Sequence, residues 1–306
     1  MLKSIALLAA FTCLWGAENS PVREVTSQAA ISAGKLIPAY YKGYVYWAGR
    51  QEPLTIFKPD GFSVPYDLTR EKTAEALAAD TDGMVAIAWR TETSGGIDLF
   101  GADGAPVRSI ETGRYWPTHL AFGEDHSLWT LGYQASPGHP ELWDDNDYMI
   151  VRKFLPDGRQ AAGYLPRSRF PRGLPPGSVT WQMSNCITVG HDRVGLWVYS
   201  GMSGNKTEWV ELSLDGQLTG RWRLDSYSNE LRVALTSDGH VFIQHANVNS
   251  SGHGIAYELL TLDRSSSTWR PVQTAPEGEL VSADGDELIF ADRVNGPMHL
   301  RWYAHP

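Results

Sequence analysis

The sequence predicts an all-β chain in which one four-stranded antiparallel unit occurs six times. Two series of repeated segments support this prediction. Asp-Gly turns recur between apolar runs, and short segments with the order strand, turn, strand alternate with them along the chain. Asp-Gly between β-rich runs is a strong hairpin signal, because both residues tolerate the positive φ of a tight turn. A third observation, a lone strand near the N-terminus, predicts how the array closes.

The first series joins the outer two strands of each unit. Each copy has an apolar run before the turn and a short extended segment after it, as expected of a hairpin. A fifth copy has lost the glycine and contains Asp263-Arg264-Ser265. The four complete copies are FKPDGFSVP (57–65), FGADGAPVR (100–108), FLPDGRQAA (154–162) and LSLDGQLTG (212–220).

The second series joins the inner two strands. Because the two series alternate strictly, each unit has four strands, and residues 18–306 give about 48 residues per unit, close to one propeller blade. A sheet that is apolar on both faces buries them by packing on neighbours around an axis, so we expect a six-bladed β-propeller. The copies are AYYKGYVYWAG (39–49), AADTDGMVAIAW (78–89), AFGEDHSLWTLG (121–132), TVGHDRVGLWVY (188–199), ALTSDGHVFIQ (234–244) and SADGDELIFAD (282–292).

Two segments need separate treatment. TREKTAEALAAD (69–80) has helical composition, but alignment with the other copies predicts an inner strand at 76–79, and a short helix over 69–75 stays open. The last unit ends at its third strand, MHLRWY (298–303). We expect PVREVT (21–26) to supply the fourth strand and close the ring, which removes an open sheet edge.

Residues 1–17 have the pattern of a secretory signal peptide, with Lys3 before a short apolar run that is too brief to span a bilayer. We therefore expect residues 18–306 to form a single domain that is secreted or periplasmic, monomeric and without a membrane span. The mature chain keeps one cysteine, Cys186, which we expect to be a small buried side chain rather than a nucleophile. A net charge of −9 and a pI of about 5.5 argue against nucleic acid as a partner.

The order of inner strand, Asp-Gly turn and second strand, followed by a Phe-x-x-Asp-Gly hairpin, resembles six-bladed propellers of the NHL and TolB-like kind. The resemblance covers nearly the whole mature chain and concerns the fold. The Asp-box of sialidases, the YWTD motif, kelch Gly-Gly pairs and recurrent WD dipeptides are absent.

The strand order sorts the connections onto two faces of the disc. The hairpins between strands one and two, and between three and four, lie on one face, which we call the turn face. The connections between strands two and three and the links between blades lie on the other, the loop face. Because long loops often carry recognition, we expect the loop face to bind. Its insertions are 132–148, 163–183 and 245–257, with shorter ones at 90–96 and 200–208.

The loop face has two sets of candidate ligand contacts. Aromatic platforms are expected from Trp116, Trp143, Trp181 and Tyr227, with Tyr133 beside them. Positive charge is expected from Arg167, Arg169 and Arg172, which suit an anionic group, a sugar or a peptide. The alternative is that the aromatic rings pack the loops against each other and that the arginines pair with Asp144, Asp145 and Asp147.

The start of each inner strand faces the axis and forms the channel mouth. A mixture of carboxylate, imidazole, amide and guanidinium suits a polar ligand or acid–base chemistry, although polar groups also line channels simply because water fills them. Alignment of the inner strands places Glu75, His119, Asn185, Arg232 and Glu279 there, with Thr118 and Glu230 close by.

Two functions therefore stay open. The first is a binding module for an unidentified protein, peptide or carbohydrate, with no cofactor. The second is an enzyme, a lactonase-like hydrolase or a lyase, at the channel mouth. The propeller lactonases that the chain resembles hold a divalent cation with one Glu, Asn residues and an Asp near the axis, and here Glu75 and Asn185 match two of them. The acidic run DDND (144–147) is a separate, weaker candidate for Ca²⁺.

Overall fold

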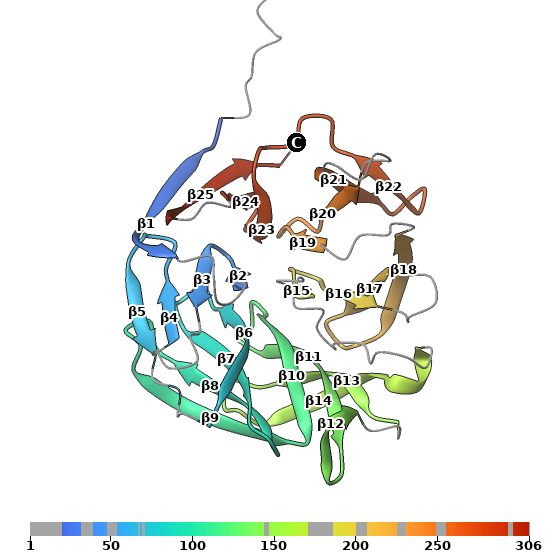
Figure 1. Cartoon of the computed structure of the whole chain (residues 1–306). Coiled ribbons are helices and arrows are strands. Elements are labelled where there is room, and N and C mark those ends of the chain that lie inside the picture. The colour runs from blue at the N-terminus through green and yellow to red at the C-terminus, as the bar shows by residue number, and fades with distance from the viewer. Residues whose placement is uncertain are drawn as a thin grey trace, which may run out of the picture.

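Six small antiparallel sheets stand in a ring, and each sheet runs outward from a common axis (Figure 1). The computed structural model describes residues 20–31, 39–47, 54–66, 68, 71–143, 147–170, 186–199, 207–224, 231–248, 255–292 and 296–305. The predicted six-bladed β-propeller is confirmed. Within these ranges one 3-10 turn interrupts the strands, at Arg167–Arg169, and no helix is long and apolar enough to cross a bilayer.

The first three blades follow chain order from the axis outward. Blade 3 carries one extra strand, which pairs only with its second strand. Their strands are β2 (Ala39–Tyr41), β3 (Tyr44–Trp47), β4 (Leu54–Phe57) and β5 (Ser63–Tyr66) in blade 1; β6 (Thr73–Ala79), β7 (Val85–Arg90), β8 (Gly95–Phe100) and β9 (Pro106–Gly113) in blade 2; and β10 (Tyr115–Phe122), β11 (Leu128–Ser136), β12 (His139–Trp143), β13 (Met149–Phe154) and β14 (Gln160–Pro166) in blade 3.

The last three blades repeat the pattern, and the N-terminal strand completes blade 6. β1 pairs antiparallel with β25, with Arg23 opposite Trp302 and Val25 opposite Leu300, so the predicted closure is confirmed. The strands are β15 (Ile187–Val189), β16 (Arg193–Tyr199), β17 (Thr207–Ser213) and β18 (Leu218–Leu224) in blade 4; β19 (Leu231–Leu235), β20 (Val241–Val248), β21 (Ile255–Asp263) and β22 (Thr268–Pro271) in blade 5; and β23 (Glu279–Asp284), β24 (Glu287–Ala291), β25 (Gly296–Ala304) and β1 (Arg23–Ile31) in blade 6.

The Asp-Gly turns have the geometry that the sequence predicts. Gly104, in the turn between β8 and β9, has a φ of 84°. The side chain of Asp103 accepts a hydrogen bond from the backbone N–H of Ala105 at 3.0 Å. An Asp side chain that mimics a turn bond, followed by a residue that adopts positive φ, is what this connection requires.

The segment of helical composition at 69–80 contains a strand. β6 begins at Thr73, and its last four residues are fully or nearly fully buried. The inner strand predicted at 76–79 is confirmed, and the alternative helix over 69–75 is wrong over its described residues, 71–75. Burial against neighbouring sheets outweighs an intrinsic preference of a fraction of a kcal/mol per residue.

Two of the expected loops are partly strand. In the 132–148 insertion, β11 continues to Ser136 and turns at residues 137–138 into β12, so much of this insertion is a hairpin. In the 245–257 insertion, β20 continues to Val248 and β21 begins at Ile255. Both connections lie between the second and third strands of a blade, so they belong to the loop face as predicted.

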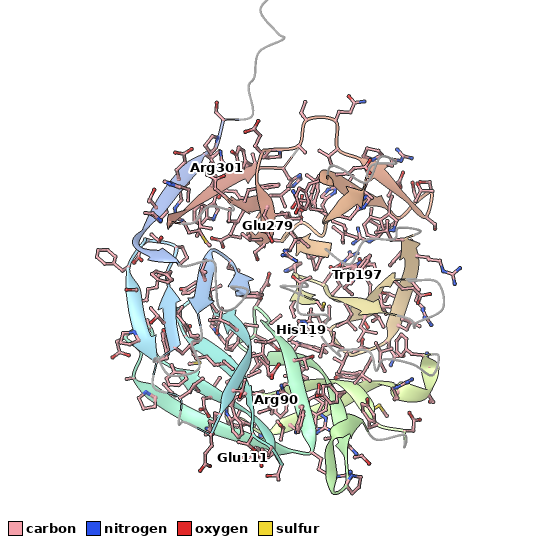
Figure 2. All side chains as sticks on the ribbon, in the orientation of Figure 1. Arg90, Glu111, His119, Trp197, Glu279 and Arg301 are labelled. Carbon is pink, nitrogen blue, oxygen red and sulfur yellow. The ribbon has the colours of Figure 1, made fainter. Side chains whose placement is uncertain are left out.

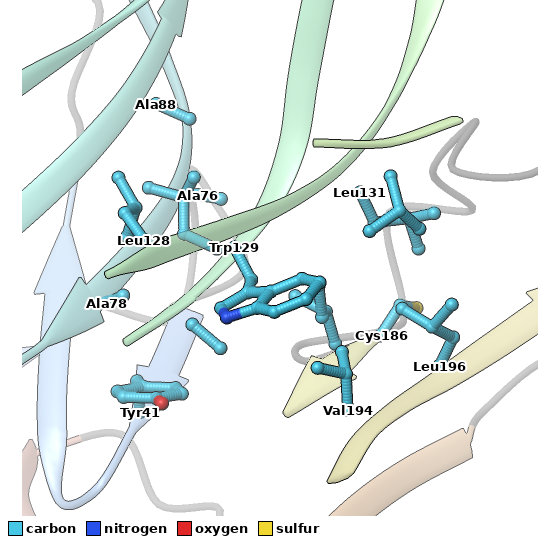
Figure 3. Close-up of a cluster of buried hydrophobic side chains, with 14 of the residues drawn as sticks. Tyr41, Ala76, Ala78, Ala88, Leu128, Trp129, Leu131, Cys186, Val194 and Leu196 are labelled. Atoms are coloured by element: carbon cyan, nitrogen blue, oxygen red, sulfur yellow. The ribbon is translucent and has the colours of Figure 1, made fainter. Parts of the chain in front are cut away.

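The largest core cluster joins side chains from blades 1 to 5. Side chains fill the space between the blades, and the labelled His119 and Glu279 lie near the centre of the ring (Figure 2). Trp129 of β11, Tyr41 of β2 and Val194 of β16 are buried together in this cluster (Figure 3). A separate, smaller cluster, which includes Val45 and Trp302, packs blade 6 on blade 1 at the closure.

The two ends of the inner strands differ in chemistry. The last residue before each inner turn is apolar or aromatic in blades 1 to 5: Tyr41, Ala79, Phe122, Val189 and Leu235. Tyr41 is buried and lies against the backbone of Phe122 from blade 3, and burial raises the pKa of its phenol. Glu75, Arg232 and Glu279 lie among the first three residues of their inner strands, toward the loop face, and His119 lies in the middle of β10. At the turn face the last strand residues are mainly apolar, and the buried polar residues Asp80 and Thr236 follow two of them directly.

Candidate functional site

Four predicted residues of the channel mouth lie in inner strands. Glu75 is in β6, His119 in β10, Arg232 in β19 and Glu279 in β23. The three candidates Asn185, Trp181 and Tyr227 lie outside the described residues, as do Glu230, Arg172, Asp144 and Asp145.

Arg232 and Glu279 form a buried ion pair that joins blades 5 and 6. Nε of Arg232 donates to Oε1 of Glu279 at 2.5 Å, and the exposed fractions of the two residues are 5% and 7%. Removing two charges from water costs several kcal/mol each, so such a pair contributes little net stability compared with apolar residues of the same size. Its presence at the axis therefore needs a reason other than stability, and ligand recognition is one.

Gln244 seals the same joint. Its amide donates from Nε2 to the carbonyl of Gly278 at 2.8 Å and accepts from the N–H of Leu280 at 2.8 Å. The side chain comes from β20 of blade 5, and both backbone groups flank Glu279 in blade 6. The sequence reasoning missed this residue. The available signal was an amide inside the otherwise apolar run VFIQ (241–244), because a buried amide needs partners.

His119 is the third buried polar group at the mouth, with an exposed fraction of 5%. Its Nδ1 lies 3.1 Å from Oγ1 of Thr118, whose hydroxyl donates to the carbonyl of Leu131 at 3.1 Å. The pairing of β10 with β11 shifts register between Pro117 and His119. This irregularity is typical of strand positions where a bulge redirects a side chain.

Glu75 and Arg90 form the second ion pair of the mouth, within blade 2. The Glu75 side chain is mostly buried, and burial raises the pKa of its carboxyl group despite the opposing charge of Arg90. The Arg90 side chain is 44% exposed and lies over the ring of Trp116, 5.4 Å from its centre. Tyr133 is close by, and burial raises the pKa of its phenol while Arg90 opposes the rise.

Trp116 is not the exposed platform that the sequence suggested. It lies in β10 with an exposed fraction of 3%, and its ring meets Tyr133 edge-on with the centres 5.6 Å apart. Its indole N–H has no hydrogen-bond partner among the described residues. The alternative interpretation, in which aromatic rings pack the loop face together, is correct for this residue. Trp143 lies in β12, and its side chain is outside the described set.

The arginine-rich segment is only partly available, because Arg167 is buried whereas Arg169 is exposed. Arg167 is buried and donates to the carbonyl of Phe170 at 3.0 Å, so its guanidinium stabilises the chain at the end of β14. Asp147 accepts from the N–H and hydroxyl of Ser168 at 2.9 and 2.8 Å, which lowers the pKa of its carboxyl group. Its oxygens are therefore engaged by Ser168, which weakens the DDND run as a cation site.

His245 lies inside β20 rather than in a loop. Its side chain is 8% exposed, and Nε2 lies 3.1 Å from Oε2 of Glu258 in β21. Backbone pairing places His245 opposite Leu231, beside the Arg232–Gln244 pair. Among the described residues of the mouth, Glu75 and Glu279 pair with arginine, and Glu258 lies against the imidazole of His245.

Cys186 is the small buried side chain that the sequence predicted. Burial raises the pKa of its thiol to about 12, and the nearby Arg232 only partly opposes this rise. A thiol that stays protonated is a poor nucleophile and a poor metal ligand. Cys186 therefore packs the base of the mouth.

The described residues of the mouth do not fit the cation site of the lactonases that the sequence resembles. Of the two residues that match that site in sequence, Asn185 lies outside the described residues, and the carboxylate of Glu75 is paired with Arg90. On the turn face, Asp80, Asp82 and His126 bring ligand-type atoms within 4.8 Å of one another. In this group Nδ1 of His126 and Oδ2 of Asp80 are hydrogen-bonded to each other at 2.7 Å.

Several solved structures share this fold. A streptogramin B lyase aligns with a TM-score of 0.50 at 14% identity, over 85% of this chain and 76% of its own. A candidate gluconolactonase aligns with a TM-score of 0.53 at 11% identity, over 93% of this chain and 94% of its own. A candidate exported protein from Bacteroides fragilis aligns with a TM-score of 0.51 at 9% identity, over 95% and 98%.

No protein-family model and no curated protein sequence matches the chain. At these identities the structural likeness shows the fold alone. The neighbours are propellers named for different activities, and propellers host unrelated functions, so the site has to be argued from its own residues.

Proposed function

We propose that this protein is an exported propeller that binds a small polar ligand without net charge, such as a sugar or a short peptide, over the channel mouth. The observation that supports this proposal most is the Arg232–Glu279 pair, buried at the loop-face end of the axis. His119 and Gln244, both buried, lie at the same end. Export is inferred from the signal-like residues 1–17 alone.

The paired charges support the choice of ligand class. Each described acid of the mouth already faces a basic group, so a strongly anionic ligand would meet carboxylates, and a cationic one would meet arginine. A ligand with hydroxyl, amide or zwitterionic groups can instead exchange hydrogen bonds with both partners of a pair. Such sites gain specificity because the wrong ligand leaves buried groups without partners.

The test is ligand-observed NMR with the purified mature protein. The probes are monosaccharides, disaccharides and dipeptides, and the variants are Glu279→Gln and His119→Gln. In Glu279→Gln we expect the affinity for a binding probe, measured from its saturation-transfer signal, to fall at least about tenfold. The reason is that a hydrogen bond to a charged group contributes about 1.5–3 kcal/mol. Asp263→Asn, in the turn between β21 and β22, is the matched control on the other face. Binding that the control abolishes and the mouth variants leave intact contradicts the proposal.

A second candidate is a hydrolase or lyase at the same mouth. The specific observation in its favour is Glu75, because a carboxyl group with a raised pKa can act as a general acid or base near neutral pH. Ring opening of δ-lactone probes is measured through the acid that it releases. We expect Glu75→Gln to abolish this reaction and to leave the circular dichroism spectrum unchanged. If no lactone is turned over while sugars or peptides bind, the binding function stands alone.

A further inference from the structure

The turn face carries histidine–carboxylate pairs that join neighbouring blades. Three joints have one: blades 2 and 3, blades 3 and 4, and blades 5 and 6. Other described contacts across joints use groups that do not titrate near neutral pH. Lys58 donates to the carbonyl of Ala102 at 2.5 Å between blades 1 and 2, and Arg264 donates to Glu211 at 3.1 Å between blades 4 and 5.

His126 fastens blade 3 to blade 2. It stands at the inner turn of its blade with a φ of 57°, where the equivalent turns of blades 2 and 5 have Gly83 and Gly239 at 86° and 88°. A side chain in this left-handed region is disfavoured, and glycine would suit the turn better. With His126 in place, Nδ1 reaches Oδ2 of Asp80 at 2.7 Å, and the Asp80 side chain is only 3% exposed.

The same turn is fastened on its other side. Glu124 lies two residues before His126, and its Oε2 is 3.1 Å from Nδ1 of His191 in the inner turn of blade 4. A single turn therefore links blade 3 to both neighbours through two imidazoles. Both members of the second pair are well exposed, so the first pair is the stronger of the two.

Blades 5 and 6 are joined in the same way near the C-terminus. Nε2 of His305 lies 3.0 Å from Oδ2 of Asp238, and His240 lies 3.6 Å from the same oxygen. The two imidazole rings are 5.0 Å apart. One carboxylate thus faces two imidazoles.

We propose that the His126–Asp80 pair makes the fastening of blades 2 and 3 at the turn face pH-dependent, so that mild acidification tightens this joint. The charged groups that face His126 are Asp80, Asp82 and Asp125, all acidic. Glu124 faces His191, and the carboxylate of Asp238 faces both His305 and His240. A protonated imidazole at His126 therefore meets negative charge.

The direction of the pH dependence follows from the pKa of His126. The hydrogen bond and charge of Asp80 raise the pKa of His126 above its ordinary value of 6.5. A group whose pKa is higher in the folded state adds stability that is complete below the unfolded pKa and is lost as pH rises through the folded pKa. The pair therefore stabilises the blade joint below about pH 6.5 and loses this effect at more alkaline pH.

The experiment compares urea denaturation midpoints at about pH 5.5 and about pH 8. The variant is the double substitution His126→Asn with His191→Asn, because Asn tolerates the left-handed turn and does not titrate. His299→Gln is the matched control, since His299 is exposed and its Nδ1 lies 3.0 Å from the hydroxyl of Thr26 rather than from a carboxylate. Hydrogen exchange of turn peptides covering 80–84, 123–128 and 190–193 gives a local readout at the two joints.

We expect the difference in urea midpoint between wild type and the double variant to be at least about twofold larger at pH 5.5 than at pH 8. At pH 5.5 the three turns of the double variant should also exchange faster than those of wild type at the same pH. His299→Gln should show the same gap at both pH values. An equal gap at both pH values in the double variant, or a larger gap at pH 8, overturns the proposal. His126→Gly with His191→Asn repeats the test on the glycine backbone that the sister turns use.

Discussion

Replacing the two members of the buried Arg232–Glu279 pair separately and together tests whether the pair serves stability or recognition. Glu279→Leu leaves a guanidinium that is 6% exposed without its carboxylate. Breaking a buried pair from one side costs about 3–5 kcal/mol. At about 2 °C per kcal/mol for a domain of this size, we expect the midpoint of thermal unfolding to fall by about 6–10 °C.

The double variant Arg232→Met with Glu279→Leu should behave differently. With no charge left to desolvate, we expect its free energy of unfolding to return to the wild-type value or to exceed it by about 1–4 kcal/mol. Differential scanning calorimetry and urea denaturation measure both variants. The proposed function adds that the double variant folds but no longer binds the probe. If the double variant is as unstable as the single one, the pair is a net stabilising contact and the argument for a recognition role is refuted.

Three further outcomes follow from the packing. Deletion of residues 1–31 removes β1 and exposes the edge of β25, so we expect loss of the soluble monomer on size-exclusion chromatography. Gly195→Ala places a Cβ in the ring of the fully buried Trp209, and we expect the free energy of unfolding in urea to fall by about 1–3 kcal/mol. Because burial raises the pKa of Cys186 to about 12, a thiol reagent should not label the native mature chain near pH 8.

Each of these has a matched control. Deletion of residues 1–19 should leave a soluble monomer, because the described closure begins after them. Gly113→Asn, at a φ of 62° with open space around it, should leave stability nearly unchanged. Cys186 should react once urea unfolds the chain. Reaction of the native protein at the unfolded rate, or a Gly195→Ala variant as stable as wild type, would show that these interiors are looser than the structure indicates.

The sequence by itself determined the architecture, because the features that set it are local. Each turn depends on a few adjacent residues, such as Asp103 and Gly104, whose chemistry requires the same geometry wherever it occurs. Counting those turns predicted the number of blades and the four strands in each. The lone segment at 21–26 predicted the closure, since one blade was a strand short.

Only the tertiary structure decided which side chains meet at the site. Arg232 and Glu279 are 47 residues apart, and Asp80 and His126 are 46 apart, so their contact depends on how one blade is placed against the next. The burial of Trp116 and Arg167 depends on the same placement. Residue type predicts that a side chain is polar or aromatic, but whether it faces a ligand, solvent or a neighbouring blade is set by long-range packing that no short stretch of sequence encodes.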